Sequence, residues 1–349
     1  MSKIKVLIVD DSLLIRNLFS DILNSSPSIE VVGTASDPIE ARDKIKTLHP
    51  DVLTLDIEMP KMDGITFLEK IMTLRPMPVV MASSLTQHGA DATIQALELG
   101  AVDFIPKIDS ANFDADELSE YLIQKVIVAA RTKVKPLSKD FVYDNSNILK
   151  IVDKLKNKKF SKEVVAIGSS TGGVEAIKEI VSLMPLCAPP IIITQHMPPK
   201  FTKSFAERMN GISELNIYEA EDGMKLENGC AYIAPGDYHL NLKKNGNSYY
   251  IKLDSSEKVT GHRPSVDAMF DSVSEVVTGK KILGVILTGM GKDGTKGMLS
   301  LKKVNAVTIG QDEMSCTVYG MPKAAYLAGA VDEQVSLSKM TERILQLCT

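Results

Sequence analysis

The feature that most constrains the fold is a repeated alternation of short apolar runs with amphipathic segments of helical period. Near the start of the chain, apolar runs occupy residues 5–9, 30–34, 52–55, 79–82 and 102–105. Segments of helical period, such as residues 39–48 and 65–74, lie between them. Strands alternating with helices are typical of a parallel sheet covered on both faces. We therefore predict an α/β domain of five βα units over residues 1–131.

The same alternation returns in the second part of the chain. Apolar runs occur at residues 164–168, 190–194, 282–289 and 306–310. Between them, residues 215–253 contain shorter runs and the turn signals ENG, APGD and KKNGNS, which predict inserted β-hairpins. The predicted fold class is thus α/β, with two doubly wound parallel-sheet domains. The second domain, residues 163–349, is expected to be Rossmann-like with a β-hairpin insertion.

The segment between the two predicted domains, residues 132–162, differs from both in composition. It is rich in lysine and polar residues and contains Pro136. This composition predicts a linker with one short helix near residues 148–155, and a long surface loop is the alternative.

Composition excludes several classes of protein. The net charge of −4 gives no basic bias toward nucleic acid, so we expect no nucleic-acid partner. No apolar run approaches the roughly 18 residues of a membrane span, which predicts no direct membrane insertion. The first residues, MSKIKVLIVDDS, meet two aspartates too early for a secretion signal. Four scattered cysteines form no CxxC pair, which fits a reducing cytoplasm without a zinc or disulfide framework.

Charged and polar side chains follow four of the predicted strands in the first domain. Asp10 and Asp11 follow the first strand, Asp56 ends the third, Ser83 ends the fourth and Lys107 follows the fifth. The carboxyl ends of parallel strands meet at one crevice, so these five side chains should lie together. Three carboxylates need a cation there, and oxygen ligands with open positions suit Mg²⁺. Taken one at a time, the aspartates could instead be helix N-caps.

These residues resemble a response-regulator receiver domain. The resemblance covers about residues 1–125 and rests on the motifs VDDS (9–12), DIEMPKMDG (56–64), SS (83–84) and GAVDFIPK (100–107). It implies that Asp56 is the phosphoacceptor, that Asp10 and Asp11 help to hold Mg²⁺, and that Ser83 and Lys107 contact the phosphoryl group.

Four further positions of the first domain are also interpreted. By the same resemblance, Phe104 is the switching aromatic residue. The proline that commonly follows the family's lysine is replaced by Ile108, which leaves the shape of that loop open. Asp51 and Asp103 match no part of the crevice, and we interpret them as surface or turn residues.

The second domain begins with a glycine-rich turn, GSSTGG, after its first strand. No lysine follows the glycines, which argues against a P-loop, and their spacing differs from GxGxxG. Residues 168–172 instead fit G-x-S-x-G, a strand-to-helix turn that exposes a serine hydroxyl, here that of Ser170. The amides at the start of the following helix favour negative charge, as on the oxyanion of an acyl transfer. A simple turn, or exposure of Ser169 in place of Ser170, remains the alternative.

A nucleophilic serine needs a base and an orienting acid. The five histidines are His49, His88, His196, His239 and His262. His49 and His88 belong to the first domain, where surface positions are expected. His196 follows the strand after the serine turn and Asp293 follows the strand at 282–288, so both can meet Ser170 at one sheet edge. Taken singly, His196 could cap a helix ahead of Pro198, and Asp293 could cap the helix starting near Gly294.

The second half resembles the catalytic domain of chemotaxis protein-glutamate methylesterases. The resemblance covers about residues 163–349 through IGSSTGGVEAI, ITQHMPPKFTKSFAERM, APGDYHL, GHRPSVDAMF and LTGMGKDG. It implies that Ser170 is the nucleophile, His196 the base and Asp293 the orienting acid. Thr171 and Met290 are implied to line the site, one or both backbone amides serving the oxyanion. The family usually has Ala at position 169 and a small residue at position 292, where this chain has Ser169 and Lys292.

Together the two resemblances imply a cytoplasmic enzyme activated by phosphorylation. Its substrates would be glutamyl methyl esters and glutamines of chemotaxis receptors, its phosphodonor a chemotaxis histidine kinase, and its only cofactor Mg²⁺ in the receiver. The competing hypothesis is a phosphorylation-switched binding protein whose serine turn holds an anion without chemistry. Under that hypothesis His196 and Asp293 would have no role.

Overall fold

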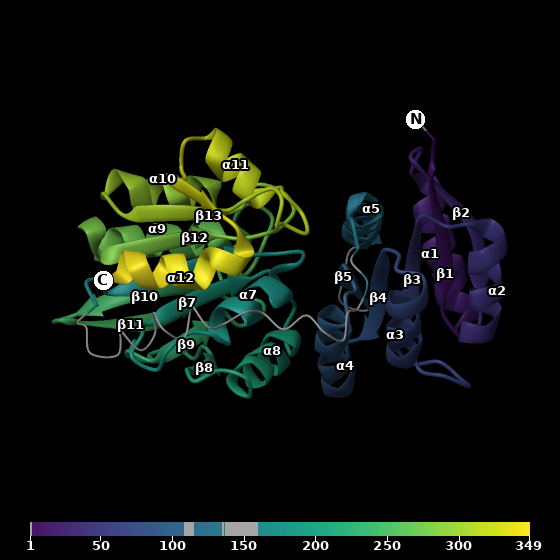
Figure 1. Cartoon of the computed structure of the whole chain (residues 1–349), viewed down its shortest axis with the longest axis horizontal. Helices are drawn as coiled ribbons and strands as arrows, with labels where there is room; N and C mark the ends of the chain where they lie inside the picture. The colour runs from purple at the N-terminus through teal and green to yellow at the C-terminus, as the bar shows by residue number, and fades with distance from the viewer. Residues whose placement is uncertain (1, 108–114, 135, 137–159) are drawn as a thin grey trace. The chain divides into compact units, whose positions relative to one another are not determined.

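The computed structural model describes residues 2–107, 115–134, 136 and 160–349, which form two compact units within residues 1–141 and 142–349. Each unit is a parallel sheet flanked by helices (Figure 1). Most of the predicted linker, including the helix expected near residues 148–155, lies outside the described residues.

The first unit contains a five-stranded parallel sheet in the order β2-β1-β3-β4-β5. Its strands are β1 (Ile4–Val9), β2 (Ile29–Ala35), β3 (Val52–Asp56), β4 (Val79–Ser84) and β5 (Asp103–Lys107). Its helices are α1 (Leu13–Ser25), α2 (Pro38–Leu48), α3 (Gly64–Leu74), α4 (Gln87–Glu98) and α5 (Ala115–Arg131). The five predicted βα units are therefore confirmed, with strand ends shifted by no more than two residues.

Apolar side chains of α1 and α5 build the core on one face of this sheet. Phe19 and Leu23 of α1 pack with Leu122 and Val126 of α5 over the buried strand residues. Our interpretation of Asp103 as a surface or turn residue is wrong. It is 6% exposed and pairs with Lys125 of α5 at 2.6 Å. Asp51 is exposed, as expected, and accepts the amide of Lys5.

The second unit contains a seven-stranded parallel sheet in the order β14-β13-β12-β6-β7-β9-β8. Its strands are β6 (Val164–Ser169), β7 (Ile191–Gln195), β8 (Asn216–Glu219), β9 (Cys230–Ile233), β12 (Ile282–Ile286), β13 (Val307–Gln311) and β14 (Glu333–Val335). Its helices are α7 (Gly173–Val181), α8 (Phe201–Asn210), α9 (Val266–Val276), α10 (Thr295–Lys303), α11 (Met321–Leu327) and α12 (Leu337–Cys348), with a short 3₁₀ helix at Gly279–Lys281. From β6 the chain passes to β7 and then to β8 at the edge of the sheet, and β9 fills the position between them. It then returns to β12 on the other side of β6, as in a doubly wound fold.

The insertion predicted for residues 215–253 contains one hairpin. Strands β10 (His239–Asn245) and β11 (Ser248–Asp254) pair antiparallel, and β10 packs against α9. The two earlier short strands, β8 and β9, instead extend the main sheet in parallel. The expectation of several hairpins is thus wrong for residues 216–233, because β9 pairs in parallel with β7 and β8 pairs in parallel with β9 as the edge strand.

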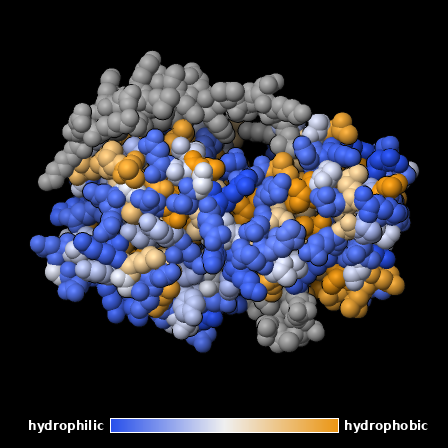
Figure 2. Space-filling model, turned by 90° about the horizontal axis from the view of Figure 1, so that it is seen from below, coloured by the Kyte–Doolittle hydropathy of each residue, from blue (hydrophilic) through white to orange (hydrophobic). Residues whose placement is uncertain are grey.

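Helices cover both faces of the larger sheet. Helices α9, α10 and α11 contact one another or the strands on one side, whereas α7, α8 and α12 form a second contacting group (Figure 1). The core below α9 includes Met269, Phe270 and Met298, all fully buried. The molecular face in Figure 2 is mostly hydrophilic, with separate hydrophobic areas. Within the described residues, no helix is long and apolar enough to span a membrane.

Candidate functional site

The turn between β6 and α7 requires glycine at two positions. Gly172 has φ +79°, and a Cβ there would lie 2.4 Å from Cβ of Thr317. A Cβ on Gly168 would lie 2.2 Å from Cγ1 of Val266 at the start of α9. These close approaches let the chain turn sharply at Ser170, as the G-x-S-x-G spacing predicts.

The two serines of this turn have different surroundings. Ser169 is fully buried, and its hydroxyl donates to Oε1 of Gln195 at 2.7 Å. Gln195 in turn donates from Nε2 to the carbonyl oxygen of Ser170 at 2.9 Å. Because the hydroxyl of Ser169 is engaged inside the protein, Ser170, which is 6% exposed, is the candidate nucleophile.

Strand register brings His196 beside the serine turn. Ser169 pairs with Gln195 in the parallel ladder of β6 and β7, so Ser170 and His196 follow at the same edge of the sheet. The amide of His196 donates to the carbonyl oxygen of Ser169 at 3.2 Å. Helix α8 begins at Phe201 after Lys200, so His196 does not cap it.

The imidazole of His196 is bound through one nitrogen. Its Nε2 lies 2.8 Å from Oδ2 of Asp293, and its side chain is 8% exposed. Its Nδ1 is buried and has no hydrogen-bond partner among the described residues. Since Nε2 is occupied by the carboxylate, Nδ1 is the nitrogen available to accept a proton.

Asp293 lies at the N-terminus of α9, where backbone amides surround its carboxylate. Its oxygens accept hydrogen bonds from the amides of Val266 and Asp267 at 2.7 and 3.0 Å. They also accept from the amide of Gly294 and the hydroxyl of Ser265, both at 2.9 Å. An anion is stabilised at such a position. Asp293 thus binds the start of α9 as well as the loop before α10.

The pKa of Asp293 reflects these contacts. Burial raises the pKa of this carboxyl group, but the hydrogen bond and charge of His196 and the amide hydrogen bonds outweigh burial and lower the pKa to about 2. Asp293 is therefore ionised across the physiological pH range and can hold the imidazole in one tautomer.

The predicted lining residues flank this cluster of Ser170, His196 and Asp293. Thr171 is 3% exposed, and its carbonyl oxygen accepts the hydroxyl of Thr288 at 3.0 Å. Met290 is half-buried and follows Gly289, where an added Cβ would lie 2.7 Å from Cβ of Ser170. Lys292, one residue before Asp293, is exposed.

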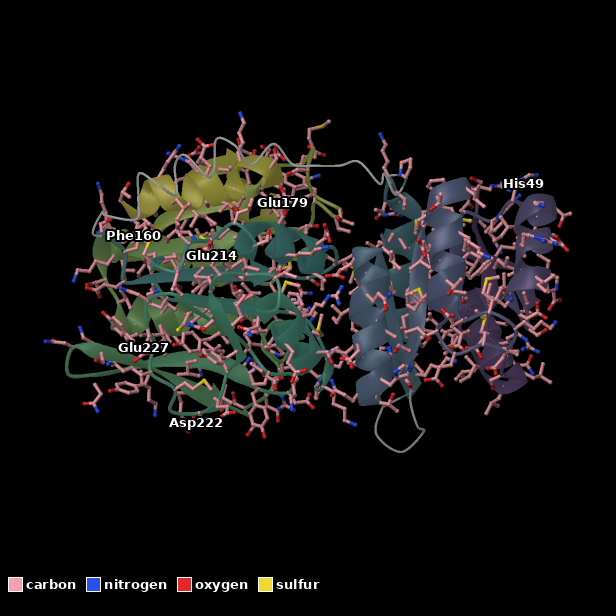
Figure 3. All side chains as sticks on the ribbon, turned by 60° about the horizontal axis from the view of Figure 1, so that its bottom comes forward. His49, Phe160, Glu179, Glu214, Asp222 and Glu227 are labelled. Carbon is pink, nitrogen blue, oxygen red and sulfur yellow. The ribbon has the colours of Figure 1, made fainter. Side chains whose placement is uncertain are left out.

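The other histidines lie in three different environments. His49, labelled in Figure 3 at the end of α2, and His88 are exposed, as expected. His239 is 1% exposed and accepts the amide of Ser265 at Nδ1, while its Nε2 faces the carbonyl oxygen of Glu257. His262 stacks on His196, with ring centroids 3.7 Å apart and an interplanar angle of 13°.

Gln195, Ser265 and His262 are contacts of the cluster to which the sequence assigned no role. All three lie in motifs quoted above for the family resemblance, Gln195 in ITQHMPPKFTKSFAERM and the other two in GHRPSVDAMF.

The acidic cluster of the first unit assembles as predicted. Carboxylate oxygens of Asp10, Asp11 and Asp56 lie within 4.8 Å of one another. Nζ of Lys107 lies 2.8 Å from Asp10 and 2.7 Å from Asp56. Helix α1 is capped by Ser12, so neither aspartate of the VDDS motif is its N-cap. A pocket lined by Asp11, Asp56, Ser84 and Lys107, among others, opens at this edge.

Burial and charge repulsion in this cluster both affect the pKa of Asp56. Burial and the negative charge of Asp10 raise the pKa of Asp56 to about 6, although Lys107 acts in the opposite direction. The pKa of Lys107 is raised in turn, because its contacts with Asp10 and Asp56 outweigh burial. A group of oxygen ligands that is short of positive charge suits a hard divalent cation.

The predicted switch residues are both buried. Ser83 is fully buried, and its hydroxyl donates to the carbonyl oxygen of Gly89 at 2.9 Å. Phe104 is 3% exposed within β5. Ile108 lies outside the described residues, so the loop after Lys107 is not described.

Two family models match the chain. Residues 165–344 match the CheB methylesterase family, and residues 6–122 match the response regulator receiver domain. A protein-glutamate methylesterase/protein-glutamine glutaminase of Caulobacter vibrioides is 52% identical, covering 100% of this chain and 99% of the relative. Its counterpart from Salmonella typhimurium is 48% identical, covering 99% of this chain and 97% of the relative.

Among solved structures, the CheB methylesterase catalytic domain of Thermotoga maritima matches with a TM-score of 0.52 and 43% identity. The match covers 53% of this chain and 98% of that domain. On these matches and on the folds of its two units, this chain belongs to the CheB methylesterase family, with a response-regulator receiver domain ahead of the methylesterase domain.

Proposed function

We propose that this enzyme hydrolyses glutamyl methyl esters on chemotaxis receptors and deamidates receptor glutamines, through a serine acyl-enzyme. The relatives named above carry both activities in their names. The observation that carries the chemistry is the 2.8 Å contact of His196 with Asp293 at the strand end beside Ser170. In the proposed roles, Ser170 is the nucleophile, His196 the base and Asp293 the orienting acid.

The first half-reaction forms the acyl-enzyme. Nδ1 of His196 takes the hydroxyl proton of Ser170 as Oγ bonds to the ester carbonyl carbon, which produces a tetrahedral oxyanion. The C–O bond to the methoxy group then breaks, and the imidazolium returns the proton so that methanol leaves. Asp293 remains ionised and stabilises the imidazolium through Nε2.

The second half-reaction regenerates the serine. Nδ1 of His196 takes a proton from water as the water oxygen bonds to the acyl carbon, and collapse of the intermediate releases glutamate and the Ser170 hydroxyl. A glutamine side chain passes through the same type of intermediate, with ammonia in place of methanol. One site thus serves both activities.

The oxyanion is assigned to backbone donors at the start of α7 and after β12. The amide of Ser170 donates to the carbonyl oxygen of Thr288, and that of Gly173 to the carbonyl oxygen of Ser170. As the family resemblance implies, one or both of the amides of Thr171 and Met290 are the proposed oxyanion donors. The positive end of α7 adds to the same field.

The receiver residues fit Mg²⁺-dependent phosphorylation of Asp56. Asp10, Asp11 and Asp56 would hold the ion, which supplies positive charge and binds a phosphoryl oxygen. Asp56 accepts the phosphoryl group on a carboxylate oxygen, and Lys107 balances its charge. The proposed donor is a chemotaxis histidine kinase in the cytoplasm.

Phosphorylation is proposed to activate the esterase. Phosphoryl-Asp56 adds charge and acceptor oxygens, which would draw Ser83 and Phe104 into new positions and change one face of the receiver. In the resting state the receiver would restrict access of the receptor to Ser170. The proposal requires a substrate that is itself a protein, since only a bulky substrate is blocked in this way.

The direct experiment measures methanol release from membranes containing methylated receptors, with Mg²⁺ and with or without a small phosphodonor. Wild-type enzyme should release methanol faster with the phosphodonor. Ser170→Ala should release none, although Asp56 should still be phosphorylated. No methanol from the wild type, with phosphorylation intact, would favour an anion-binding role for the serine turn.

A further inference from the structure

His262 is held against the ring of His196 by a tight turn. The amide of each of Val259 and His262 donates to the carbonyl oxygen of the other at 3.0 Å. The two residues between them, Thr260 and Gly261, have φ of +53° and +83°. Positive φ at both central positions is characteristic of a type I′ turn, which fixes the direction of the residue that follows.

Side-chain contacts anchor this turn from both ends. The hydroxyl of Thr260 donates to Oδ2 of Asp267 at 2.8 Å. Beyond His262, the guanidinium of Arg263 donates to the carbonyl oxygens of Ser255 and Ser256 at 2.9 Å each. The ring of His262 is therefore carried on a backbone with little freedom to move.

The N-terminus of α9 forms hydrogen bonds both with Asp293 and with this turn. The amide of Asp267 donates to Oδ1 of Asp293, and the carboxylate of Asp267 accepts Thr260. A second carboxylate oxygen of Asp267 accepts the amide of Gly297 in α10. Two groups that contact His196, the carboxylate of Asp293 and the ring of His262, thus share one rigid support.

We infer that His262 is a positioning residue that holds the ring plane of His196 by stacking on it. The inference rests on the proposed function in taking His196 as the base of Ser170. A single hydrogen bond at Nε2 lets the imidazole swing about the contact with Asp293. A flat ring 3.7 Å away and nearly parallel limits that motion, so that the imidazole of His196 keeps one ring plane for the proton transfer from Ser170. It also shields one face of the imidazole from water.

This role predicts that the ring of His262 matters and its nitrogen atoms do not. His262→Phe keeps a flat aromatic ring, His262→Gln keeps a polar side chain without a ring, and His262→Ala keeps neither. His49→Ala, which removes an exposed histidine of the receiver, is the matched control. All variants are made in the full chain and compared in the presence of Mg²⁺ and a phosphodonor.

Two rates are measured for each variant. The first is methanol release from methylated receptor membranes, resolved into kcat and KM. The second is the rate constant for labelling by a fluorophosphonate. In that reaction Ser170 Oγ bonds to phosphorus, His196 takes the hydroxyl proton and fluoride leaves. The labelling rate depends on the base and not on the ester, and its final stoichiometry counts the correctly folded sites.

Per folded site, His262→Ala and His262→Gln should both lower kcat and the labelling rate constant by about threefold to tenfold, the range expected for one aromatic pair. KM should stay within about twofold because substrate contacts are unchanged. His262→Phe should restore both rates to within about twofold of the wild type.

Three results would overturn the inference: wild-type rates in His262→Ala, slow rates in His262→Phe equal to those of His262→Ala, or a change confined to KM. A wild type that labels at Ser170 but releases no methanol overturns the proposed substrate alone. The labelling rates then still test the role of His262, which would be supported by slow labelling of His262→Ala and His262→Gln and by near-wild-type labelling of His262→Phe.

Discussion

At the residue scale, adjacent hydroxyl groups after β6 differ in what they can do. Ser169 donates to Gln195, which holds the carbonyl oxygen of Ser170. This hydrogen bond and the burial of Ser169 predict that Ser169 stabilises the turn, whereas Ser170 is the proposed nucleophile.

Replacing each serine separates these roles. Ser169→Ala leaves Oε1 of buried Gln195 without its donor, and should lower the free energy of unfolding of the methylesterase domain by about 1–3 kcal/mol. Its kcat should stay within about threefold of the wild type, because Gln195 still contacts Ser170. Urea unfolding and methanol release measure the two effects. If Ser169→Ala lost turnover and Ser170→Ala retained it, Ser169 would be the nucleophile in place of Ser170.

The low pKa of Asp293 has a consequence for stability. Because folding lowers this pKa from 3.8 to about 2, the carboxylate stabilises the domain above pH 4, and this contribution is lost as the pH falls toward 2. Asp293→Asn cannot titrate. Its unfolding free energy should therefore fall less than that of the wild type between pH 5 and pH 2.5, by about 1–2 kcal/mol.

Urea unfolding at the two pH values measures this difference. Other carboxyl groups titrate in both proteins, and comparing the variant with the wild type cancels their contribution. An identical pH dependence in the two proteins would contradict the assignment of the low pKa to Asp293.

At the element scale, the start of α7 depends on Gly172. Gly172→Ala would combine an unfavourable positive φ with a contact of 2.4 Å to Thr317. We expect a loss of more than about 2 kcal/mol in unfolding free energy and a lower kcat, because the turn carries Ser170. Adding Thr317→Gly should recover the part caused by the contact.

Gly246→Ala is the matched control for that experiment. Gly246 has φ +59° and nothing within 4 Å of an added Cβ, so its substitution should cost only about 1 kcal/mol. Equal losses in the two alanine variants would mean that the contact with Thr317 is relieved by a small shift.

Elements were predictable where a periodic pattern was long, and less so where it was short. The buried strands of both sheets follow apolar runs, and the site residues at their ends follow from parallel pairing. Strands β8 and β9 have only four residues each, too few for the sequence to indicate pairing with a parallel neighbour. The pairing of Asp103 with Lys125, and the contacts of Gln195 and His262, depend on packing between distant segments.

At the scale of the whole molecule, the proposed regulation joins the two units by function. A fragment of residues 160–349 lacks the receiver, so its resting activity on methylated receptors should exceed that of the unphosphorylated full chain by about fivefold or more. Asp56→Asn in the full chain should remain at the resting level when a phosphodonor is added. Equal resting rates of fragment and full chain would contradict restriction by the receiver.

Asp293 accepts four donors besides His196, and this limits how many hydrogens move during the reaction. In the proposed mechanism, this carboxylate stays ionised when the imidazolium of His196 forms, so proton transfer ends at the imidazole ring. Only one proton is then transferred in the rate-limiting step. Hydrolysis rates in mixtures of light and heavy water should fall on a straight line against the deuterium fraction, whereas a curved plot would mean that the carboxylate shares the transfer.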